Sequence, residues 1–394
     1  MTRRILLYLL ASCLVLSACS GDTADTTTTA STTLPPTTTV PPTTTTLPEL
    51  EVADAPLGLV ELVRAFYDYA AGVSTAAPVA AQHVVEAITP GDWDVPLSGT
   101  AFLGLFKEDK VAVVEAEDDF FLAVNDGRGW RIIGGEWPSL EIPAIVGQGP
   151  RHVAVVGSDA RPGEDVESTR ADSIHFVALD GEGGGAVVGL PRDSYVAVPG
   201  FGRRKITNSL SLGGPEVMME AFTDLTGLPL EGYLLTGFSG FEELLGSVLG
   251  GVTVEVPFAI NDRWAHVNLS AGVQELDGAE ALGFARARKT VPGGDFTRSE
   301  HQGVILLGAA AIVKQMGMTA LPALMELAEP HLKTDLSAEE LFMFSVMAVS
   351  ADLDSIPNVV APGSPGSAGG ASVVFLANSA EDLWADLADG RLDP

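Results

Sequence analysis

Positive charge is concentrated in one short segment of an otherwise acidic chain. The stretch FARARKTVPGGDFTRSEHQG, residues 284–303, carries Arg286, Arg288, Lys289 and Arg298, whereas the whole chain of 394 residues has only 22 Lys and Arg against 52 Asp and Glu. Alternation in Phe-Ala-Arg-Ala-Arg predicts a strand with both arginines on one face. Two guanidinium groups side by side repel each other unless an anion lies between them. The segment therefore predicts an anion-binding site.

The end of the same segment predicts the start of a helix. Thr297-Arg298-Ser299-Glu300 matches a capping box, and apolar residues follow it. Arg298 then lies in the first turn, where a cation opposes the helix dipole, with His301 and Gln302 on the same face. An anion suits this place, because free N–H groups and Arg298 can bind it together. Phosphate binding is favoured over a solvated basic loop that pairs with surface carboxylates.

Two carboxylates stand at the ends of predicted strands. Asp159 follows the buried-type strand 152–157, and Asp172 precedes the strand 173–180. Strand ends in α/β sheets are common ligand sites, and Mg²⁺ takes one or two carboxylates together with phosphate oxygens. The alternative is that these two residues cap turns and pair with neighbouring arginines, Arg161 and Arg170. Spacing alone leaves both interpretations open.

Metal carboxylates and several arginines are together the groups that hold a pyrophosphate. A site of this kind clamps the diphosphate, neutralises the leaving phosphate and orients an acceptor hydroxyl. Neither a Ser-His-Asp order nor a paired-carboxylate glycosidase pattern competes with it. The net charge of −30 also argues against nucleic acid as a partner and against general adhesion to anionic lipid.

The N-terminus predicts a lipid anchor. Arg3 and Arg4 precede an apolar run of about 14 residues, which is short of the ~20 needed for a membrane span. Leu16-Ser17-Ala18-Cys19 matches a bacterial lipoprotein signal, so residues 1–18 are predicted to be removed and Cys19 to be lipidated. Residues 19–49 are rich in Thr and Pro and predict a disordered stalk. The expected location is the extracytoplasmic face of the bacterial cell membrane, with contact through the lipid anchor only.

Periodicity divides the remaining chain into two predicted parts. Residues 50–147 predict a small accessory α+β module with an amphipathic helix at 59–72 and strands at 110–115, 120–124 and 130–133. Its acidic run at 117–119 reads as a solvated turn. From 151 to 394, strands at 152–157, 173–180, 185–190 and 252–257 interleave with helices at 215–227 and 237–251. This order predicts an α/β fold, a layered sandwich around a mixed sheet.

Several motifs, in order, resemble those of the LytR-CpsA-Psr (LCP) family: G-S-D-A-R at 157–161, R-A-D-S at 170–173, L-P-R-D-S at 190–194, K-I-T-N at 205–208, G-G at 213–214 and 250–251, A-R-A-R at 285–288 and G-D-F-T-R-S-E-H-Q at 294–302. The resemblance covers residues 151 to about 318. It implies an α/β/α sandwich outside the cytoplasmic membrane that binds a polyprenyl-pyrophosphate-linked glycan with Mg²⁺. It also implies a phosphotransferase that moves the phosphoglycan to a peptidoglycan acceptor.

The resemblance assigns roles to residues at matching positions. Asp159 and Asp172 would bind magnesium, and Lys205 and Asn208 would lie at the rim of the pocket. Asp193 would orient the metal or an arginine, or act as the base, and is grouped with Asp172 and Arg192 as catalytic. The expected pyrophosphate contacts are Arg192, Arg286, Arg288, Arg298 and Gln302.

Some features depart from the family pattern. His301 stands where an arginine is often found, the anchor is a lipobox in place of a transmembrane helix, and the accessory module is an addition. Two other functions use the same site: hydrolysis of a polyprenyl or nucleotide pyrophosphate, and a non-catalytic scaffold that binds lipid-linked glycan. A polyprenyl tail needs an apolar groove, for which helices 215–226 and 303–316 are candidates; the alternative is that Met218, Met219 and Met316 are ordinary core residues.

Overall fold

The computed structural model describes residues 50–392, which fall within one compact unit. The predicted signal peptide 1–18, the lipidation site Cys19 and the stalk 19–49 lie outside the described residues and stay predictions. No single helix among residues 50–392 has the length and apolar composition needed to span a bilayer, although Asp295–Met316 and Met318–His331 reach both limits as a pair bent by 99°.

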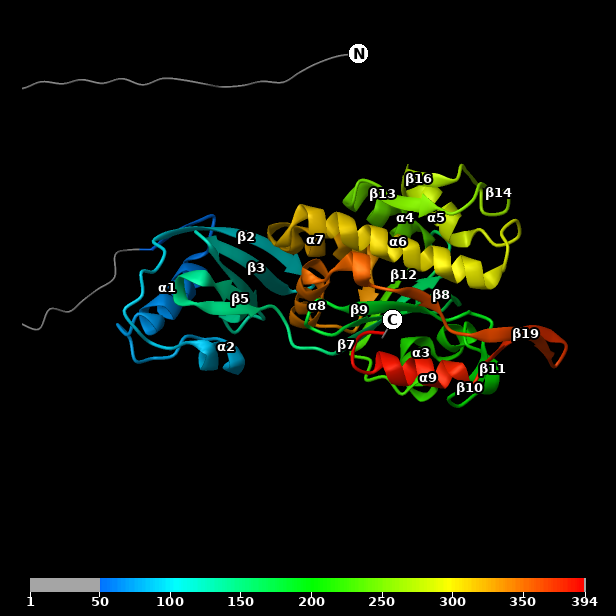
Figure 1. Cartoon of the computed structure of the whole chain (residues 1–394), viewed down its shortest axis with the longest axis horizontal. Helices are drawn as coiled ribbons and strands as arrows, with labels where there is room; N and C mark the ends of the chain where they lie inside the picture. The colour runs from blue at the N-terminus through cyan, green and yellow to red at the C-terminus, as the bar shows by residue number, and fades with distance from the viewer. Residues whose placement is uncertain (1–49, 393–394) are drawn as a thin grey trace, which may run out of the picture. The chain divides into compact units, whose positions relative to one another are not determined.

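The N-terminal part is a six-stranded sheet with helices packed against it (Figure 1). Its strands follow one another in chain order, and only the first pair is parallel. Helix α1 (Leu57–Ala70) buries Phe66, whose ring stacks on that of Trp137 at 4.7 Å. The other elements are β1 (Glu51–Ala53), α2 (Gln82–Ala87), β2 (Ser98–Phe106), β3 (Asp109–Ala116), β4 (Asp119–Asn125), β5 (Trp130–Trp137) and β6 (Ile142–Ile145). The expected α+β composition is confirmed.

One expectation for this part holds for two of its three residues. Glu117 and Asp118 form the exposed turn, but Asp119 is 1% exposed and does not belong to it. Its carboxylate accepts hydrogen bonds from the Tyr67 hydroxyl at 2.7 Å and from the Ser139 hydroxyl at 2.6 Å. The acidic run therefore contributes one side chain to the core, because tertiary partners satisfy its charge.

The second part is built on a mixed six-stranded sheet of order β17-β12-β7-β8-β9-β18. Strand β7 pairs in parallel with β12 and antiparallel with β8, so the sheet contains both kinds of ladder. The strands are β7 (Arg151–Ser158), β8 (Ala171–Leu179), β9 (Gly185–Gly189), β12 (Gly232–Thr236), β17 (Lys333–Thr334) and β18 (Asn358–Val360).

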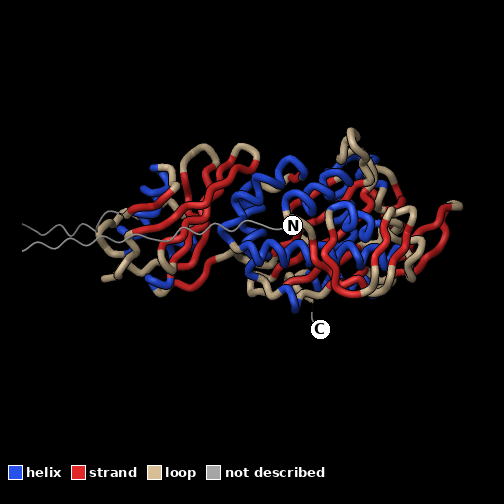
Figure 2. The backbone as a smooth tube through the Cα atoms, turned by 90° about the horizontal axis from the view of Figure 1, so that it is seen from above, coloured by secondary structure: helices blue, strands red, loops and turns tan. Residues whose placement is uncertain are grey.

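Helices cover both faces of this sheet, which confirms the expected α/β/α sandwich (Figure 1). On one face Phe176 of β8 meets Phe222 of α3 (Asn208–Thr226) and Trp384 of α9 (Ser379–Leu387). On the other face lie α6 (Asp295–Met316), α7 (Leu321–Ala328) and α8 (Ala338–Ser350). Figure 2 shows the strand-rich N-terminal part beside this helix-rich part.

Shorter elements surround the sandwich. Helices α4 (Phe238–Glu243) and α5 (Gly278–Arg286) lie next to α6, and a π-helical turn at Leu244–Val248 continues α4. The remaining strands form hairpins: β10 (Tyr195–Val198) with β11 (Gly202–Lys205), β13 (Val252–Val256) with β16 (Gly272–Leu276), β14 (Ile260–Asp262) with β15 (Val267–Leu269), and β19 (Gly363–Ala368) with β20 (Ala371–Leu376).

Candidate active site

A polar cavity of about 480 Å³ opens where β7 and β8 end beside α5 and α6. It brings together six of the site residues predicted from the sequence, which come from segments far apart in the chain. They are Asp159, Asp172, Arg192, Arg286, Arg288 and Arg298. Arg161, Arg170 and Lys289 also line it. The scarce positive charge of this chain therefore converges on one cavity, which the carboxylates of Asp159, Asp172 and Asp262 also line.

A β-bulge directs Asp172 toward this cavity. Gly157 pairs with Ser173 and Ser158 pairs with Ala171, so Asp172 is the extra residue on β8. A bulge changes the direction of a side chain relative to the regular pleat. Arg192, which follows β9, donates a hydrogen bond from Nη1 to Asp172 Oδ1. The bulge and this ion pair together hold the carboxylate at the cavity.

The other carboxylate, Asp159, is engaged by Arg170. Its Oδ1 accepts the Arg170 backbone N–H at 2.9 Å, and its Oδ2 accepts the Arg170 guanidinium at 2.5 Å from Nη2. This is the pairing with Arg170 that the sequence left open as an alternative to metal binding. Both carboxylates nevertheless line the same cavity, so pairing and cation binding are compatible in geometry.

Asp295 was missed as a site residue by the sequence reasoning, and three arginines surround it. Arg298 Nη2 lies 2.6 Å from Asp295 Oδ1, while Arg192 Nε and Arg288 Nη1 each lie 3.9 Å from it. Asp295 Oδ2 is buried and has no hydrogen-bonding partner among the described residues. The carboxylate gathers three guanidinium groups that would otherwise repel one another. Its position inside the G-D-F-T-R-S-E-H-Q motif was the available signal.

Arg298 is a buried cation. Its side chain is 7% exposed, and its Nε has no hydrogen-bonding partner among the described residues. Burial is the main cause that lowers the pKa of Arg298 to about 10; Asp295 opposes the shift, and Arg192 adds to it. The guanidinium is thus incompletely neutralised by the protein, which favours binding of an anion.

Two local predictions around these arginines are wrong. Phe284-Ala285-Arg286 ends helix α5 and is not a strand, because a capping box at Asp277 and Glu280 starts a helix upstream. The backbone becomes extended only at Ala287, and this change brings Arg288 to the same cavity as Arg286. Helix α6 begins at Asp295 after Gly294, so there is no capping box at Thr297, although Arg298 still lies in the first turn.

Asp262, which sequence reasoning also missed, anchors the arginine loop. It is 1% exposed, and its Oδ2 accepts the backbone N–H groups of Arg288 and Lys289 at 3.2 and 3.1 Å. Its Oδ1 accepts those of Trp264 and Ala265. Burial acts to raise the pKa of Asp262, but these four hydrogen bonds together lower it below its usual value. The bound carboxylate fixes where the chain turns after α5.

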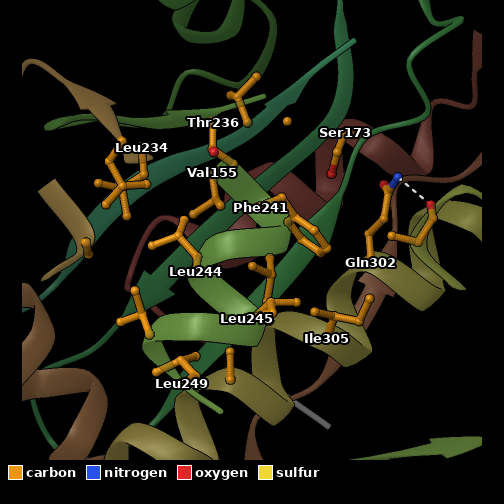
Figure 3. Close-up of a pocket in the computed structure, with 18 of the residues that line it drawn as sticks. Val155, Ser173, Leu234, Thr236, Phe241, Leu244, Leu245, Leu249, Gln302 and Ile305 are labelled. Carbon is orange, nitrogen blue, oxygen red and sulfur yellow. Dashed lines mark hydrogen bonds between the residues drawn. The ribbon is translucent and has the colours of Figure 1, made fainter. Parts of the chain in front are cut away.

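An apolar cavity of about 360 Å³ adjoins the polar one (Figure 3). Leu244, Leu245 and Leu249 line it from the α4 side, and Ile305 lines it from α6. Gln302 lies at its polar end, where Nε2 donates a hydrogen bond to the Ala285 carbonyl at 3.0 Å. The two cavities share Asp172, Phe238, Arg286 and Arg298. Arg286 stands at this junction, with its guanidinium 4.4 Å from the Phe238 ring.

Of the two helices expected to form an apolar groove, only one does so. Residues 303–316 of α6 contribute Ile305, Ala309 and Val313 to the cavity. Helix α3 packs on the opposite face of the sheet, where Met218 is fully buried in the core with Phe176. The expectation for residues 215–226 is therefore wrong, because those side chains fill the core.

The expected rim residues lie outside the residues that line the two cavities. Lys205 Nζ forms an ion pair with Asp193 Oδ1 at 2.9 Å, and Asn208 begins helix α3. Burial, the largest influence on the pKa of Arg192, acts to lower it. Asp193 is nevertheless near enough for its negative charge to help raise the pKa of Arg192. Asp193 thus acts on Arg192 through its charge, while Lys205 holds the Asp193 carboxylate outside both cavities.

The described residues contain no group of three or more His, Cys, Asp or Glu side chains arranged to hold a metal ion. Two carboxylates at one cavity, Asp159 and Asp172, still fit Mg²⁺, which completes its octahedron with water and phosphate oxygens. Within residues 50–392, Asp172 is hydrogen-bonded only through Oδ1, so its second oxygen is available. The donor set is therefore compatible with a magnesium ion that is bound together with a phosphate ligand.

His301 is not a cavity residue. It is 1% exposed and stacks on Phe284, with ring centroids 4.2 Å apart. Burial lowers the pKa of His301 to about 4, against a weaker opposing contact with the Phe284 backbone. Residue 301 belongs to the core between α5 and α6. The absence of an arginine at this position therefore does not lower the positive charge of the cavity.

We expect His301→Phe to lose less stability than the wild type as the pH falls. The folded pKa lies below the unfolded value of 6.5, so the unfolded state binds more protons and stability falls as the pH drops from 6.5 to about 4. For His301 this fall in the free energy of unfolding is about 3 kcal/mol. It should disappear in His301→Phe, which keeps the stacking on Phe284. Urea unfolding at several pH values measures it, with the exposed His266→Asn as control. An unchanged slope in His301→Phe would contradict the assignment.

Comparisons with known proteins agree with this geometry. The LytR_cpsA_psr family model matches residues 138–388. The protein named probable cell wall biosynthesis protein LcpB from Corynebacterium glutamicum is 36% identical over 151 residues, which is 35% of this chain and 36% of that protein. The Bacillus subtilis protein named polyisoprenyl-teichoic acid–peptidoglycan teichoic acid transferase TagT is 30% identical over 199 residues, 48% of this chain and 61% of that protein. The chain thus spans less than two thirds of either relative.

Solved structures show the same fold. The crystal structure of B. subtilis TagV superposes with a TM-score of 0.53 at 22% sequence identity, covering 63% of this chain and 100% of that one. The structure described as TagT bound to LIIa-WTA superposes with a TM-score of 0.50 at 23% identity, covering 62% of this chain and 92% of that one.

Proposed function

The chain belongs to the LytR_cpsA_psr family, and on this premise we propose that it transfers a phosphoglycan from a polyprenyl-pyrophosphate carrier to peptidoglycan. The observation that carries the proposal is the junction of the two cavities. An arginine-lined polar cavity meets an apolar one at Arg286 and Arg298. A ligand with a charged pyrophosphate between a sugar and a long hydrocarbon chain is complementary to that junction. The name of the TagT relative, a polyisoprenyl-teichoic acid–peptidoglycan teichoic acid transferase, supports this substrate class.

The geometry suggests how the residues would act. Arg286, Arg288 and Arg298 hold the pyrophosphate by charge-assisted hydrogen bonds. The acceptor hydroxyl attacks the phosphorus next to the glycan, a new P–O bond forms, and the bond to the polyprenyl phosphate breaks. The hydroxyl proton passes to a carboxylate of the site, and the arginines stabilise the charge that grows on the leaving phosphate. Arg192, held by Asp172, lies at the same cavity and serves this last step.

Magnesium is part of the proposal. Asp159 and Asp172 would hold it at the cavity, and the bound ion supplies positive charge to the phosphate oxygens. Each carboxylate pairs with an arginine, but Arg170 engages both oxygens of Asp159, whereas Arg192 engages only Oδ1 of Asp172. We therefore expect Asp172 to contribute the larger share of the metal affinity. Calorimetric titration of Mg²⁺ with and without inorganic pyrophosphate tests whether the two ligands bind cooperatively.

Transfer is distinguished from its alternatives by the products. The purified chain is incubated with a polyprenyl-pyrophosphate glycan, Mg²⁺ and a peptidoglycan oligomer. A phosphodiester-linked glycan–peptidoglycan product supports the proposal. Release of free glycan phosphate alone means that the protein is a pyrophosphate hydrolase. Binding without any turnover, unchanged in Asp172→Ala, would reduce the protein to a non-catalytic scaffold.

We also propose that Cys19 anchors the protein by a lipid to the extracytoplasmic face of the membrane, as the Leu-Ser-Ala-Cys motif indicates. Cys19→Ala blocks lipidation and is expected to prevent cleavage at that site. Fractionation combined with mass spectrometry of the N-terminal peptide checks this, since the mature protein should begin at a modified Cys19. An unmodified cysteine in the membrane fraction would contradict the lipid anchor.

A further inference from the structure

The apolar cavity extends beyond the length of a simple pocket. Its lining residues on α6 run from Arg298 at the polar end to Val313, a span of about 22 Å at the rise of an α-helix. Leu321 and Met325 of α7 and Leu341 of α8 line its far part. The cavity is therefore an elongated channel alongside α6, with the charged groups at one end.

One wall residue at the far end comes from outside the sandwich. Phe106, the last residue of β2 in the N-terminal sheet, is 1% exposed and is the sole cavity-lining residue between positions 50 and 147. It packs in one core cluster with Leu321, Met325 and Leu341, and Val313 packs against the same cluster. Phe106 thus lies among the residues of the distal end, away from Arg298.

The end of β2 is fixed firmly in this place. The Leu105 backbone N–H donates to Glu326 Oε2 at 3.0 Å, and Lys107 Nζ donates to the Leu336 carbonyl at 2.9 Å. At Gly104 the strand passes so close to α7 that a Cβ atom would lie 1.9 Å from the Pro322 carbonyl oxygen. Contacts on both sides of Phe106 therefore hold its ring at the channel (Figure 1 shows β2 reaching α7 and α8).

We propose that the N-terminal sheet supplies, through Phe106, the closed end of the channel and so limits the length of polyprenyl tail that the protein binds. This inference rests on the proposed function, because it needs a polyprenyl carrier as the ligand. A tail gains affinity with each buried methylene until its end reaches Phe106. Isoprene units beyond that point must leave the channel or stay in the membrane, and they add no affinity.

The test uses the full chain and polyprenyl monophosphates of increasing length, without glycan or acceptor. Wild-type affinity should rise with each isoprene unit and then level off. In Phe106→Leu, which frees space for about one methylene group, the level should lie at a Kd about fourfold lower than in the wild type; in Phe106→Trp the level should be reached with a shorter tail. Leu105→Ala, an exposed neighbour on the same strand, should match the wild type. Thermal melting confirms that each variant is folded.

The outcomes separate the two ideas. Tails that bind with the same length dependence in the wild type, Phe106→Leu and Phe106→Trp would overturn the role of Phe106 and leave the proposed function intact. Absence of binding by any polyprenyl phosphate to the folded wild type would overturn both. A shift in Leu105→Ala equal to that in Phe106→Leu would also overturn the inference, because the effect would then belong to the strand and not to the channel.

Discussion

Arg298→Met is expected to stabilise the ligand-free protein and to lower its activity strongly. The depressed pKa of Arg298, about 10, means that the fold disfavours its charge. Removing the charge should raise the free energy of unfolding by up to about 3 kcal/mol. Arg192 and Arg288 remain at 3.9 Å from Asp295, so that carboxylate keeps cationic neighbours. Loss of one preorganised donor should lower kcat/KM by about 10²–10³-fold.

Two measurements check this opposition between stability and function. Chemical denaturation gives the free energy of unfolding without ligand, and the melting temperature with inorganic pyrophosphate gives binding. The wild type should gain stability from pyrophosphate, and Arg298→Met should gain much less. Arg128→Met, on the exposed Arg128 far from the cavities in sequence, is the control. A destabilised Arg298→Met with normal turnover would show that Arg298 is a structural ion-pair partner of Asp295 and no more.

The layered fold was predictable because its signals are local. Buried-type runs such as residues 152–157 become central strands, and the αL glycine Gly227 ends α3 as expected. Errors occur where a short pattern is compatible with two structures. The five alternating residues at 284–288 fit a strand, yet the upstream capping box at Asp277 starts a helix that runs to Arg286. Asp119 reads as polar turn sequence, and only its distant partner Tyr67 explains its burial.

The site was predictable in its charged residues and not in its arrangement. A local cluster of arginines in an acidic chain identifies Arg286, Arg288 and Arg298. The repulsion between their like charges must be offset by a ligand or by an opposite charge. The composition gives no signal for the counter-charge Asp295 or the loop anchor Asp262, since acidic residues are common in this sequence; only its place in the G-D-F-T-R-S-E-H-Q motif could have indicated Asp295. The apolar channel depends on Phe106, which tertiary packing alone brings to α7. Long-range contacts of this kind have no local pattern.

The strongest test of catalysis is a substitution that improves binding while it stops the reaction. Asp172→Asn keeps the shape of the side chain at the β8 bulge and its hydrogen bond from Arg192. It removes a negative charge from the cavity that receives the anion. Without metal, inorganic pyrophosphate should therefore bind about fivefold more tightly, a gain of roughly 1 kcal/mol from reduced repulsion. Turnover should nevertheless fall by about 10²–10³-fold, because the carboxylate charge that holds Mg²⁺ is lost.

These opposite changes cannot come from a merely damaged fold, which would weaken binding and turnover together. Titration calorimetry with pyrophosphate measures the first change, and the transfer assay at increasing Mg²⁺ measures the second. Asp224→Asn, an exposed position on α3, serves as the matched control and should alter neither quantity. If Asp172→Asn retains turnover while it binds pyrophosphate more tightly, Asp172 only repels the substrate and the catalytic role falls. If Asp172→Asn lowers both the affinity for pyrophosphate and the turnover, the carboxylate acts by holding Arg192 in place for binding, and the metal must be held elsewhere.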